Sequence, residues 1–198
     1  MNIVCIVEGD GEVKALPTLL RRFSTWRESS VFPTIGQPIR VRRDRFLNNA
    51  DEFRKQILLA NLKCQPSGWI LILLDADDDC PRTKALEVLR RAEKLAPGAR
   101  ISVVLAKYEY EAWFIAAAPT LKGRRDFVPP AVVPDAESVR GAKQWMSKCL
   151  PHGKKYHEVV DQAAFSAVFD LDMAYTNSRS FRKLVSEWDR NVRPSASN

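Results

Sequence analysis

The chain has 198 residues, of which 45% are hydrophobic and 28% are charged, and this composition argues against a largely disordered protein. The longest apolar run, at 69–74, is far too short to cross a bilayer and no signal segment opens the chain, so we expect a cytoplasmic protein. The length of the chain suits one folding unit. The four cysteines lack C-x-x-C spacing, so the sequence indicates neither a disulfide framework nor a zinc knuckle. The net charge of +7 suits a polyanionic partner, although many basic proteins bind no nucleic acid.

Predicted strands and helices alternate through the first half of the chain. In chain order, the apolar patterns predict a buried strand at 2–7, a helix at 12–23, an edge strand at 38–45, a helix at 51–63, a buried strand at 69–74, a helix at 82–95, a buried strand at 101–105 and a helix beginning within 107–114. Strands that are apolar on both faces and alternate with helices imply a covered parallel sheet. We therefore predict an α/β fold with a mostly parallel central sheet flanked by helices.

A proline-rich connection and further helices make up the rest of the chain. Residues 119–134 carry four of the twelve prolines. Helical spacing then predicts helices at 139–150, 157–168 and 180–191. The resulting division is an α/β core at 1–118, a connection at 119–137, a C-terminal helical extension packed on the core at 138–193 and a tail at 194–198.

Acidic residues follow three of the predicted strands. Glu8 comes directly after the first strand. Asp75 and Asp77 follow the buried strand at 69–74, and Glu109 and Glu111 follow the next one. In an open parallel sheet, the loops at the carboxyl ends of the strands converge on one ligand-binding edge. We therefore expect these acids, far apart in the sequence, to share one pocket.

A shared pocket of carboxylates calls for a divalent cation. Carboxylates held together repel one another and take up protons unless a cation neutralises them. Magnesium prefers oxygen ligands and is usually held by one or two carboxylates together with substrate phosphates. The sequence thus predicts a site for Mg²⁺ or Mn²⁺.

Each acid also has a simpler structural explanation. Residues 75–79 could form a solvated turn that caps the following helix, and Glu8 could be an exposed turn residue. Glu109 and Glu111 could face solvent on their helix. An acid directly after a fully apolar strand is usually at least partly buried, however, so the joint pattern is more specific than any single member.

Other catalytic motifs fail when their spacing is checked. Gly9-x-Gly11 lacks the third glycine of a dinucleotide fingerprint, and no Walker lysine follows it. His152 and His157, the two histidines, have no companion ligands at zinc spacing, and no Gly-x-Ser-x-Gly elbow is present. These failures leave the carboxylates as the main candidate for chemistry.

At these residues the sequence resembles the Toprim domain, the metal-binding module of topoisomerases, primases and several nucleases, including the overcoming-lysogenization-defect nucleases. Residues 3–12, with Glu8 in a glycine-containing loop, match the first Toprim motif, and residues 70–77, which end in Asp75-Ala-Asp77, match the second. Glu111 resembles a further acidic position of the nuclease branches. Topoisomerases also need a nucleophilic tyrosine on a separate domain that does not fit in this chain, so the resemblance implies hydrolysis of nucleic acid.

The Toprim resemblance also implies roles for individual residues. Glu8, Asp75, Asp77 and Glu111 would hold one or two metal ions, which activate a water and stabilise the leaving oxygen. Lys154 or Lys155 would supply a cation to the phosphate, although solvation explains either lysine more readily. The residues expected to contact nucleic acid are Arg40, Arg42, Arg43, Arg45, Tyr156, Arg179 and Arg182. A solvent-exposed face of the predicted strand at 38–45 explains Arg40, Arg42, Arg43 and Arg45 nearly as well.

More narrowly, the chain resembles a Toprim-like bacterial family of uncharacterised function that is often encoded beside an ATPase in anti-phage or mobile-element clusters. The segments that carry this likeness are 74–79, 109–113, 155–156, 161–162 and 180–181. The likeness implies an ATPase partner and an antiviral role. Two alternatives stay open: a non-catalytic scaffold for that ATPase with a weak metal site, and a nucleotide-sugar glycosyltransferase, which would use the Asp-x-Asp but would not require Glu8. A haloacid-dehalogenase-type phosphatase fits less well, because its Asp-x-Asp follows the first strand.

Overall fold

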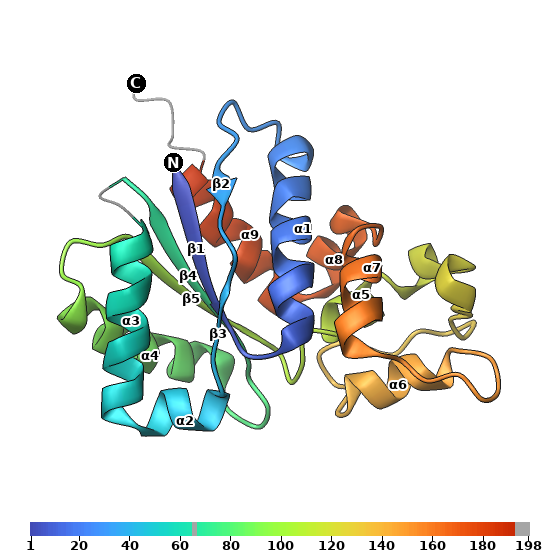
Figure 1. Cartoon of the computed structure of the whole chain (residues 1–198). Helices are drawn as coiled ribbons and strands as arrows, with labels where there is room; N and C mark the ends of the chain where they lie inside the picture. Colours follow the sequence, from blue (N-terminus) through green and yellow to red (C-terminus); the bar gives the residue numbers. More distant parts are fainter. Residues whose placement is uncertain (65–66, 193–198) are drawn as a thin grey trace.

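A parallel sheet forms the centre of the computed structural model, which describes residues 1–64 and 67–192 (Figure 1). The strands are β1 (Asn2–Val7), β2 (Thr34–Ile35), β3 (Ile39–Arg40), β4 (Trp69–Asp75) and β5 (Ile101–Ala106). Their order is β2-β1-β4-β5, β3 also pairs with β1, and every pairing is parallel. The short strands β2 and β3 pair with opposite ends of β1 and form one edge of the sheet, and β5 forms the other.

Helices cover both faces of the sheet because successive strand residues point to opposite sides. The covering helices are α1 (Asp10–Trp26), α2 (Arg43–Asn48), α3 (Ala50–Cys64), α4 (Pro81–Leu95) and α9 (Arg179–Val192). Ile3 and Cys5 of β1 belong to one buried cluster with residues of α1 and α9. Val4 and Ile6 belong to a second cluster with residues of α2, α3 and α4. The predicted α/β class, with a covered parallel sheet and a C-terminal helical segment, is confirmed.

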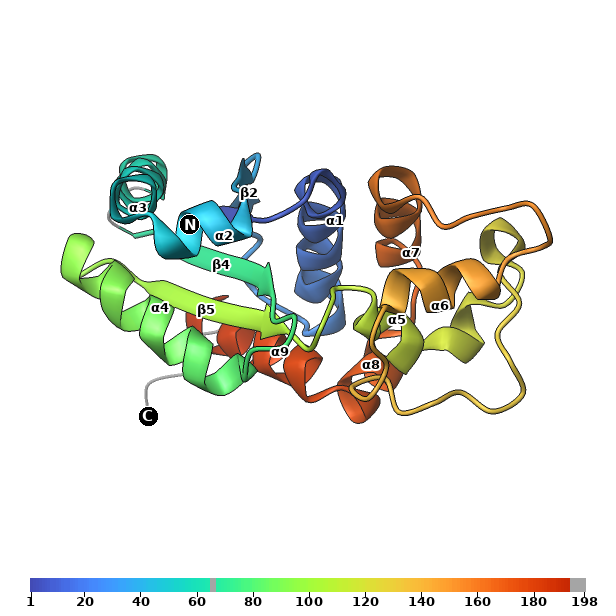
Figure 2. The same cartoon turned by 90° about the horizontal axis from the view of Figure 1, so that it is seen from below.

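The remaining helices are short and lie together beside α1 (Figures 1 and 2). They are α5 (Ala112–Ala116), the 3-10 helices η1 (Ala118–Leu121) and η2 (Arg124–Asp126), α6 (Ala142–Lys148), the π-helix η3 (Glu158–Gln162), α7 (Ala163–Ser166) and α8 (Leu171–Asn177). Phe114, Phe127 and Phe165 are buried among them and continue the cluster that contains α1 and α9. The second half of the chain is therefore packed against the sheet layer through one shared core.

The edge strand predicted over 38–45 is wrong beyond its first half. The chain pairs with β1 at β3 and at Val41, whose N–H donates to the carbonyl of Val7 at 2.8 Å, and it then turns into α2 at Arg43. The guanidinium of Arg43 reaches the backbone carbonyl of Asp75 at 3.0 Å. A tertiary contact thus ends the strand where alternation alone would continue it.

Two other local predictions need correction. The helix predicted over 157–168 begins as the π-helix η3, and α8 was missed although Asp170 caps it by accepting the N–H of Met173 at 2.7 Å. An N-terminal aspartate before an apolar residue is a recognised start signal that was readable in the sequence. Within the part of the chain that the structure describes, no helix has both the length and the apolar character to cross a membrane.

Candidate functional site

The acidic residues that follow β1, β4 and β5 lie at one edge of the sheet. These three strands are neighbours and run parallel, so their carboxyl ends point the same way. Glu8 comes directly after β1, and Asp75 is the last residue of β4. Glu111 lies in the turn between β5 and α5. Sequence spacing therefore located the carboxyl edge of the sheet correctly.

Asp75 lies at the centre of this edge. Its Oδ1 atom accepts a hydrogen bond of 2.8 Å from the backbone N–H of Tyr110. Burial raises the pKa of Asp75 well above its usual range, and the charges of Glu111 and Glu12 raise it further, while Lys143 opposes the shift. These mutual effects mean that carboxylates from three separate segments are within electrostatic range of one another.

Glu8 is half-buried beside Asp77. Burial raises the pKa of Glu8, the charge of Asp77 raises it further, and the guanidinium of Arg43 opposes the shift. The Oε2 atom of Glu8 is buried and has no hydrogen-bond partner among the described residues. A buried carboxylate oxygen without a donor costs free energy unless a proton or a cation supplies the missing interaction.

Glu111 is fully buried and forms the deepest part of the site. Its Oε1 atom accepts a hydrogen bond of 2.9 Å from the hydroxyl of Tyr156 and a longer one of 3.4 Å from Nε2 of Gln162. Burial raises its pKa to about 7, although Lys143 and the Tyr156 hydroxyl oppose the shift. Its Oε2 atom, like Oε2 of Glu8, has no partner among the residues described.

Glu12 and Gln162 join the first turn of α1 to the second half of the chain. Gln162 donates from Nε2 to Oε1 of Glu12 at 3.0 Å, and both side chains are buried. Gly11 permits this approach, because a Cβ atom at that position would lie only 1.9 Å from Oε1 of Gln162 and 2.9 Å from the carbonyl oxygen of Glu158. Glycine at this position in the first turn of α1 therefore permits close packing against η3.

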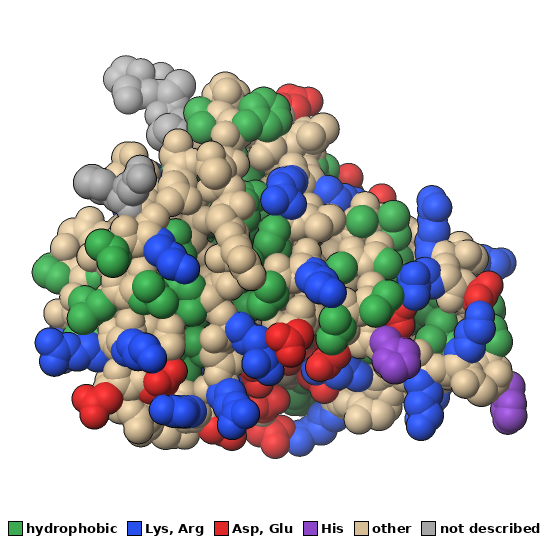
Figure 3. Space-filling model, viewed as in Figure 1, with side chains coloured by type: hydrophobic (Ala, Val, Ile, Leu, Met, Phe, Trp, Pro, Cys, Tyr) green, Lys and Arg blue, Asp and Glu red, His purple; other side chains and the backbone are tan. Residues whose placement is uncertain are grey.

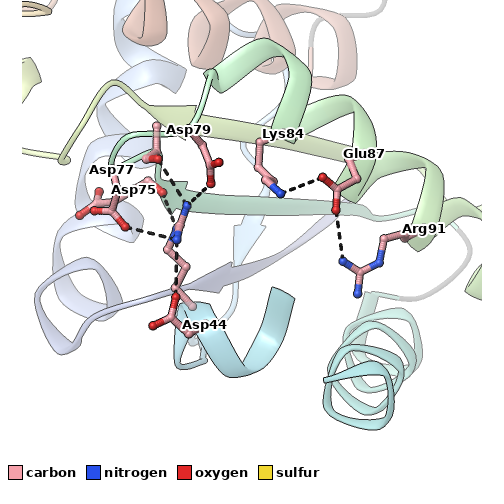
Figure 4. Close-up of polar contacts among 9 residues, drawn as sticks. Asp44, Asp75, Asp77, Asp79, Lys84, Glu87 and Arg91 are labelled. Carbon is pink, nitrogen blue, oxygen red and sulfur yellow. Dashed lines mark hydrogen bonds and ion pairs between the residues drawn. The ribbon is translucent and has the colours of Figure 1, made fainter. Parts of the chain in front are cut away.

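The side chains of Asp75, Asp77 and Asp79 lie close together after β4 (Figure 4), and Arg43 of α2 pairs with two of them, Asp77 and Asp79. It donates to the carbonyl of Asp75 and, at 2.6 Å, to Oδ2 of Asp79, and its guanidinium lies 3.3 Å from Oδ2 of Asp77. Its side chain is only 12% exposed, whereas that of Asp77 is 59% exposed. Arg43 is therefore not part of an open basic strand face, and Asp77 lies at the rim of the site, paired with a protein cation.

Lys143 is a site residue that sequence reasoning missed. It lies in α6; its backbone N–H donates to Oε2 of Glu109 at 3.1 Å, and its Nζ atom is 3.2 Å from Oε2 of Glu158. Burial alone would lower the pKa of Lys143, but the charges of Glu111 and Asp75 outweigh it and raise the pKa above the usual range. No local pattern marks this lysine, since only packing brings α6 to the sheet edge.

Tyr156 and the neighbouring lysines differ from their predicted roles. Tyr156 is buried against Phe165 and bonded to Glu111, so it does not line an open groove. Lys155 is exposed and borders a separate cavity of about 600 Å³, and Lys154 pairs with Asp126 in the same region. Lys143, rather than Lys155, is the lysine whose charge acts on the carboxylates.

The remaining arginines of the predicted nucleic-acid surface are spread over the molecule. Arg40 pairs with Asp10 at 3.1 Å, Arg45 lies 3.6 Å from a carboxylate oxygen of α3, and Arg42 is exposed. Arg182 donates to backbone carbonyls in the last turn of α8, and Arg179 borders a cavity between α4 and α9. Figure 3 shows lysine and arginine side chains beside a group of acidic side chains at the lower edge of the face that it presents.

The site residues suit a cation that protein and substrate bind together, rather than a cation that protein side chains bind alone. Within residues 1–64 and 67–192, no group of three or more His, Cys, Asp or Glu side chains could hold a metal ion as it stands. The four predicted ligands are therefore not gathered into one finished cluster. The unpartnered Oε2 atoms of Glu8 and Glu111 are nevertheless hard oxygen donors, and magnesium typically takes only one or two protein carboxylates.

Fold and site together define an α/β protein with a carboxylate-rich site at the carboxyl edge of a parallel sheet. The family model described as "Domain of unknown function (DUF4276)" matches residues 7–188, which is most of the chain, and the protein belongs to this family. Neither the curated proteins nor the solved structures with which the chain was compared gave a match. The family description names no activity, so the Toprim resemblance stays a prediction.

Proposed function

We propose that this protein is a Toprim-type nuclease that hydrolyses phosphodiester bonds in nucleic acid with Mg²⁺ or Mn²⁺. The observation that carries the proposal is the pair of buried, unpartnered carboxylate oxygens, Oε2 of Glu8 and Oε2 of Glu111, at the same sheet edge as Asp75. Both lack a donor among the described residues, and a divalent cation is the partner that their chemistry favours. The net charge of +7 accords with a polyanionic substrate.

In this proposal the carboxylates bind the cation and Lys143 binds the phosphate. Glu8, Asp75 and Glu111 would bind the metal together with oxygen atoms of the substrate. Asp77 would also bind the metal after giving up its contact with Arg43. The metal would supply Lewis-acid activation of water and stabilise charge on the leaving oxygen. Lys143 offsets the negative charge of Glu111 and Asp75, so that an anionic phosphate can approach. The exposed Arg42, with Arg40 and Arg45, would position the backbone without reading sequence.

A cleavage assay tests this function. Purified protein is incubated with plasmid, single-stranded DNA and RNA in Mg²⁺ or Mn²⁺, beside the variants Asp75→Asn and Glu8→Gln. We expect each variant to lose at least about 100-fold in rate, because mutations that remove charge-stabilising groups from such sites typically cost that much. Glu93→Gln, at an exposed position of α4, is the matched control and is expected to cleave like the wild type. Cleavage that persists unchanged in Asp75→Asn would contradict the proposal.

The Glu8→Gln variant also separates the nuclease from a glycosyltransferase. An enzyme that holds a diphosphate through Asp-x-Asp alone would keep its metal binding and its activity in this variant. A nuclease that uses the first Toprim motif would lose both. Nucleotide-sugar turnover is therefore measured in parallel with cleavage.

A second candidate is a non-catalytic partner of an ATPase, and one observation favours it. Among the described residues, no group of three or more His, Cys, Asp or Glu side chains could hold a metal ion, and a metal site that has lost its function would show the same lack. A protein inert on every nucleic acid, yet able to change the rate of ATP hydrolysis by an ATPase encoded beside it, would support this candidate. An antiviral role belongs to the nuclease proposal and follows from the family resemblance.

A further inference from the structure

A groove lies along β5, and its lining includes none of Glu8, Asp75, Asp77 and Glu111. Its volume is about 820 Å³, and it is bordered by α4 on one side and α9 on the other. Figure 2 shows β5 flanked by these two helices. The apolar residues that line it come from α4 and β5 and are Ala85, Leu86, Leu89, Ile101, Val103 and Leu105. Leu86 is 45% exposed although it is a large hydrophobic residue, so this lining is accessible from outside.

The floor of the groove is the free edge of the sheet. The carbonyls of Arg100 and Ala106 accept hydrogen bonds from β4, so even-numbered residues of β5 point their backbone groups toward β4. In a parallel sheet, the odd-numbered residues of β5 then direct both their N–H and their C=O groups away from β4. Those residues are Ile101, Val103 and Leu105. No strand and no side chain in the described part of the chain pairs with their outward groups.

These outward groups favour an added strand. Val103 and Leu105 are only 4% and 3% exposed, so water reaches them poorly. Buried backbone N–H and C=O groups without partners cost free energy, and an extended segment that pairs with the edge supplies those partners. Addition of a strand to an exposed sheet edge is a common way in which proteins bind extended peptides.

The rim of the groove is cationic. The five positively charged residues on it are Arg82, Lys107, Arg179, Lys183 and Arg190. Of the two acidic residues, Glu137 accepts from the N–H of Ser180 at 2.7 Å, and Glu187 accepts from the hydroxyl of Ser102 at 2.6 Å and also pairs with Lys183 and, at 3.4 Å, with Arg190. Arg82 and Arg179 are exposed and have no salt-bridge partner among the described residues. The rim therefore presents a net positive charge to any occupant.

We propose that the β5 groove binds an extended acidic segment of a partner protein, which pairs with Ile101, Val103 and Leu105 as a further strand of the sheet. Alternate side chains of that segment face opposite sides of the sheet. Apolar side chains meet the Ala85, Leu86 and Leu89 stripe of α4, and acidic side chains meet the rim cations, above all Arg179 of α9, which has no salt-bridge partner among the described residues. An apolar floor and an unpaired strand edge suit a peptide rather than a nucleic-acid backbone. The groove is separate from the carboxylate site, so this inference does not depend on the nuclease proposal.

Peptide binding to the full-length protein tests the proposal. The probe is an eight-residue peptide of alternating glutamate and valine, blocked at both ends, and binding is followed by fluorescence anisotropy. Hydrogen exchange then reports the mode of binding. The amides of Ile101, Val103 and Leu105 are expected to exchange at least tenfold more slowly in the complex, whereas those of Ser102 and Val104, already bonded to β4, change little.

Matched variants test the charge and the apolar stripe. The double reversal Arg82→Glu/Arg179→Glu is expected to weaken binding at least tenfold, and Leu86→Asp is expected to weaken it severalfold. The controls are Arg54→Glu/Lys55→Glu, an equal change of charge on exposed positions of α3, and Leu62→Asp, at a residue of α3 that is 80% exposed. Both controls are expected to bind the peptide like the wild type.

Several outcomes would overturn the proposal. They are no binding at millimolar peptide, equal binding of a lysine-valine peptide, and equal binding of a glutamate-valine peptide whose alternate amides are N-methylated. A single-stranded oligonucleotide that displaces the peptide and depends on Arg82 and Arg179 would assign the groove to nucleic acid. A dimer in sedimentation that Leu86→Asp dissociates would assign it to a second copy of this chain.

Discussion

The hydroxyl of Tyr156 donates a hydrogen bond of 2.9 Å to Oε1 of Glu111, although 45 residues separate the two in the chain. Both side chains are buried, so this contact fixes the position of the deepest carboxylate of the site. Glu111 keeps its Oε2 atom without a donor among the described residues. Tyr156 thus orients Glu111 while leaving one oxygen open to a ligand.

Replacing Tyr156 with phenylalanine is expected to destabilise the protein at neutral pH. The change leaves Oε1 of Glu111 with only the longer contact to Gln162, and hydrogen bonds to charged groups contribute about 1.5–3 kcal/mol. Urea unfolding measures the difference. Tyr175→Phe is the control, because Tyr175 is 39% exposed, and its hydroxyl makes no hydrogen bond to a described residue; it should unfold like the wild type. Equal losses in both variants would contradict the assigned role of the Tyr156 hydroxyl.

The pKa of Glu111 predicts how stability depends on pH. Burial raises this pKa from 4.5 to about 7, so the folded state holds the proton more tightly than the unfolded state does. Stability without metal should therefore fall as pH rises through that window, by up to about 3 kcal/mol from this group. Glu111→Gln should lose this component and be more stable than the wild type at pH 8 in the presence of a chelator. Stability curves that run parallel from pH 5 to pH 8 would show that Glu111 does not titrate in this way.

Gly11 is expected to tolerate no side chain. A Cβ atom there would meet Oε1 of Gln162 at 1.9 Å and backbone of η3 at 2.9 Å, and overpacking of this kind costs about 1–3 kcal/mol. Gly36→Ala is the control, since its nearest neighbour, the carbonyl of Ile3, would lie at 3.7 Å. Thermal unfolding of both variants provides the test. A Gly11→Ala protein as stable as Gly36→Ala would mean that the first turn of α1 and η3 do not pack as closely as the geometry indicates.

Asp75→Asn is expected to have opposite effects with and without magnesium. Without a divalent cation, the variant should melt at a higher temperature than the wild type, because asparagine does not ionise, whereas ionisation of Asp75 is opposed by burial and by the charges of Glu111 and Glu12. An asparagine oxygen can still accept the N–H of Tyr110. Millimolar Mg²⁺ should raise the melting temperature of the wild type but not that of the variant, because ligands that bind the folded state stabilise it. A magnesium response of equal size in both proteins would place the cation elsewhere.

The sequence by itself determined the sheet and the edge at which the acids gather. Continuous apolar strands such as residues 69–74 are buried on both faces whatever surrounds them, and the alternation with helices makes the sheet parallel. The positions of Glu8 and Asp75 follow from that topology, because parallel strands end on the same side. The start of α8 was also readable, from the capping residue Asp170.

Tertiary structure alone decided which side chains complete the site. Lys143 and Tyr156 come from the second half of the chain and reach the carboxylates through packing, which no local periodicity encodes. Arg43 looked like part of a wet strand face, yet its hydrogen bonds to the segment after β4 bury it and end the strand. Side-chain partners depend on distances between segments remote in sequence, whereas strands and helices depend on patterns within a few residues, and this difference separates what could be predicted from what could not.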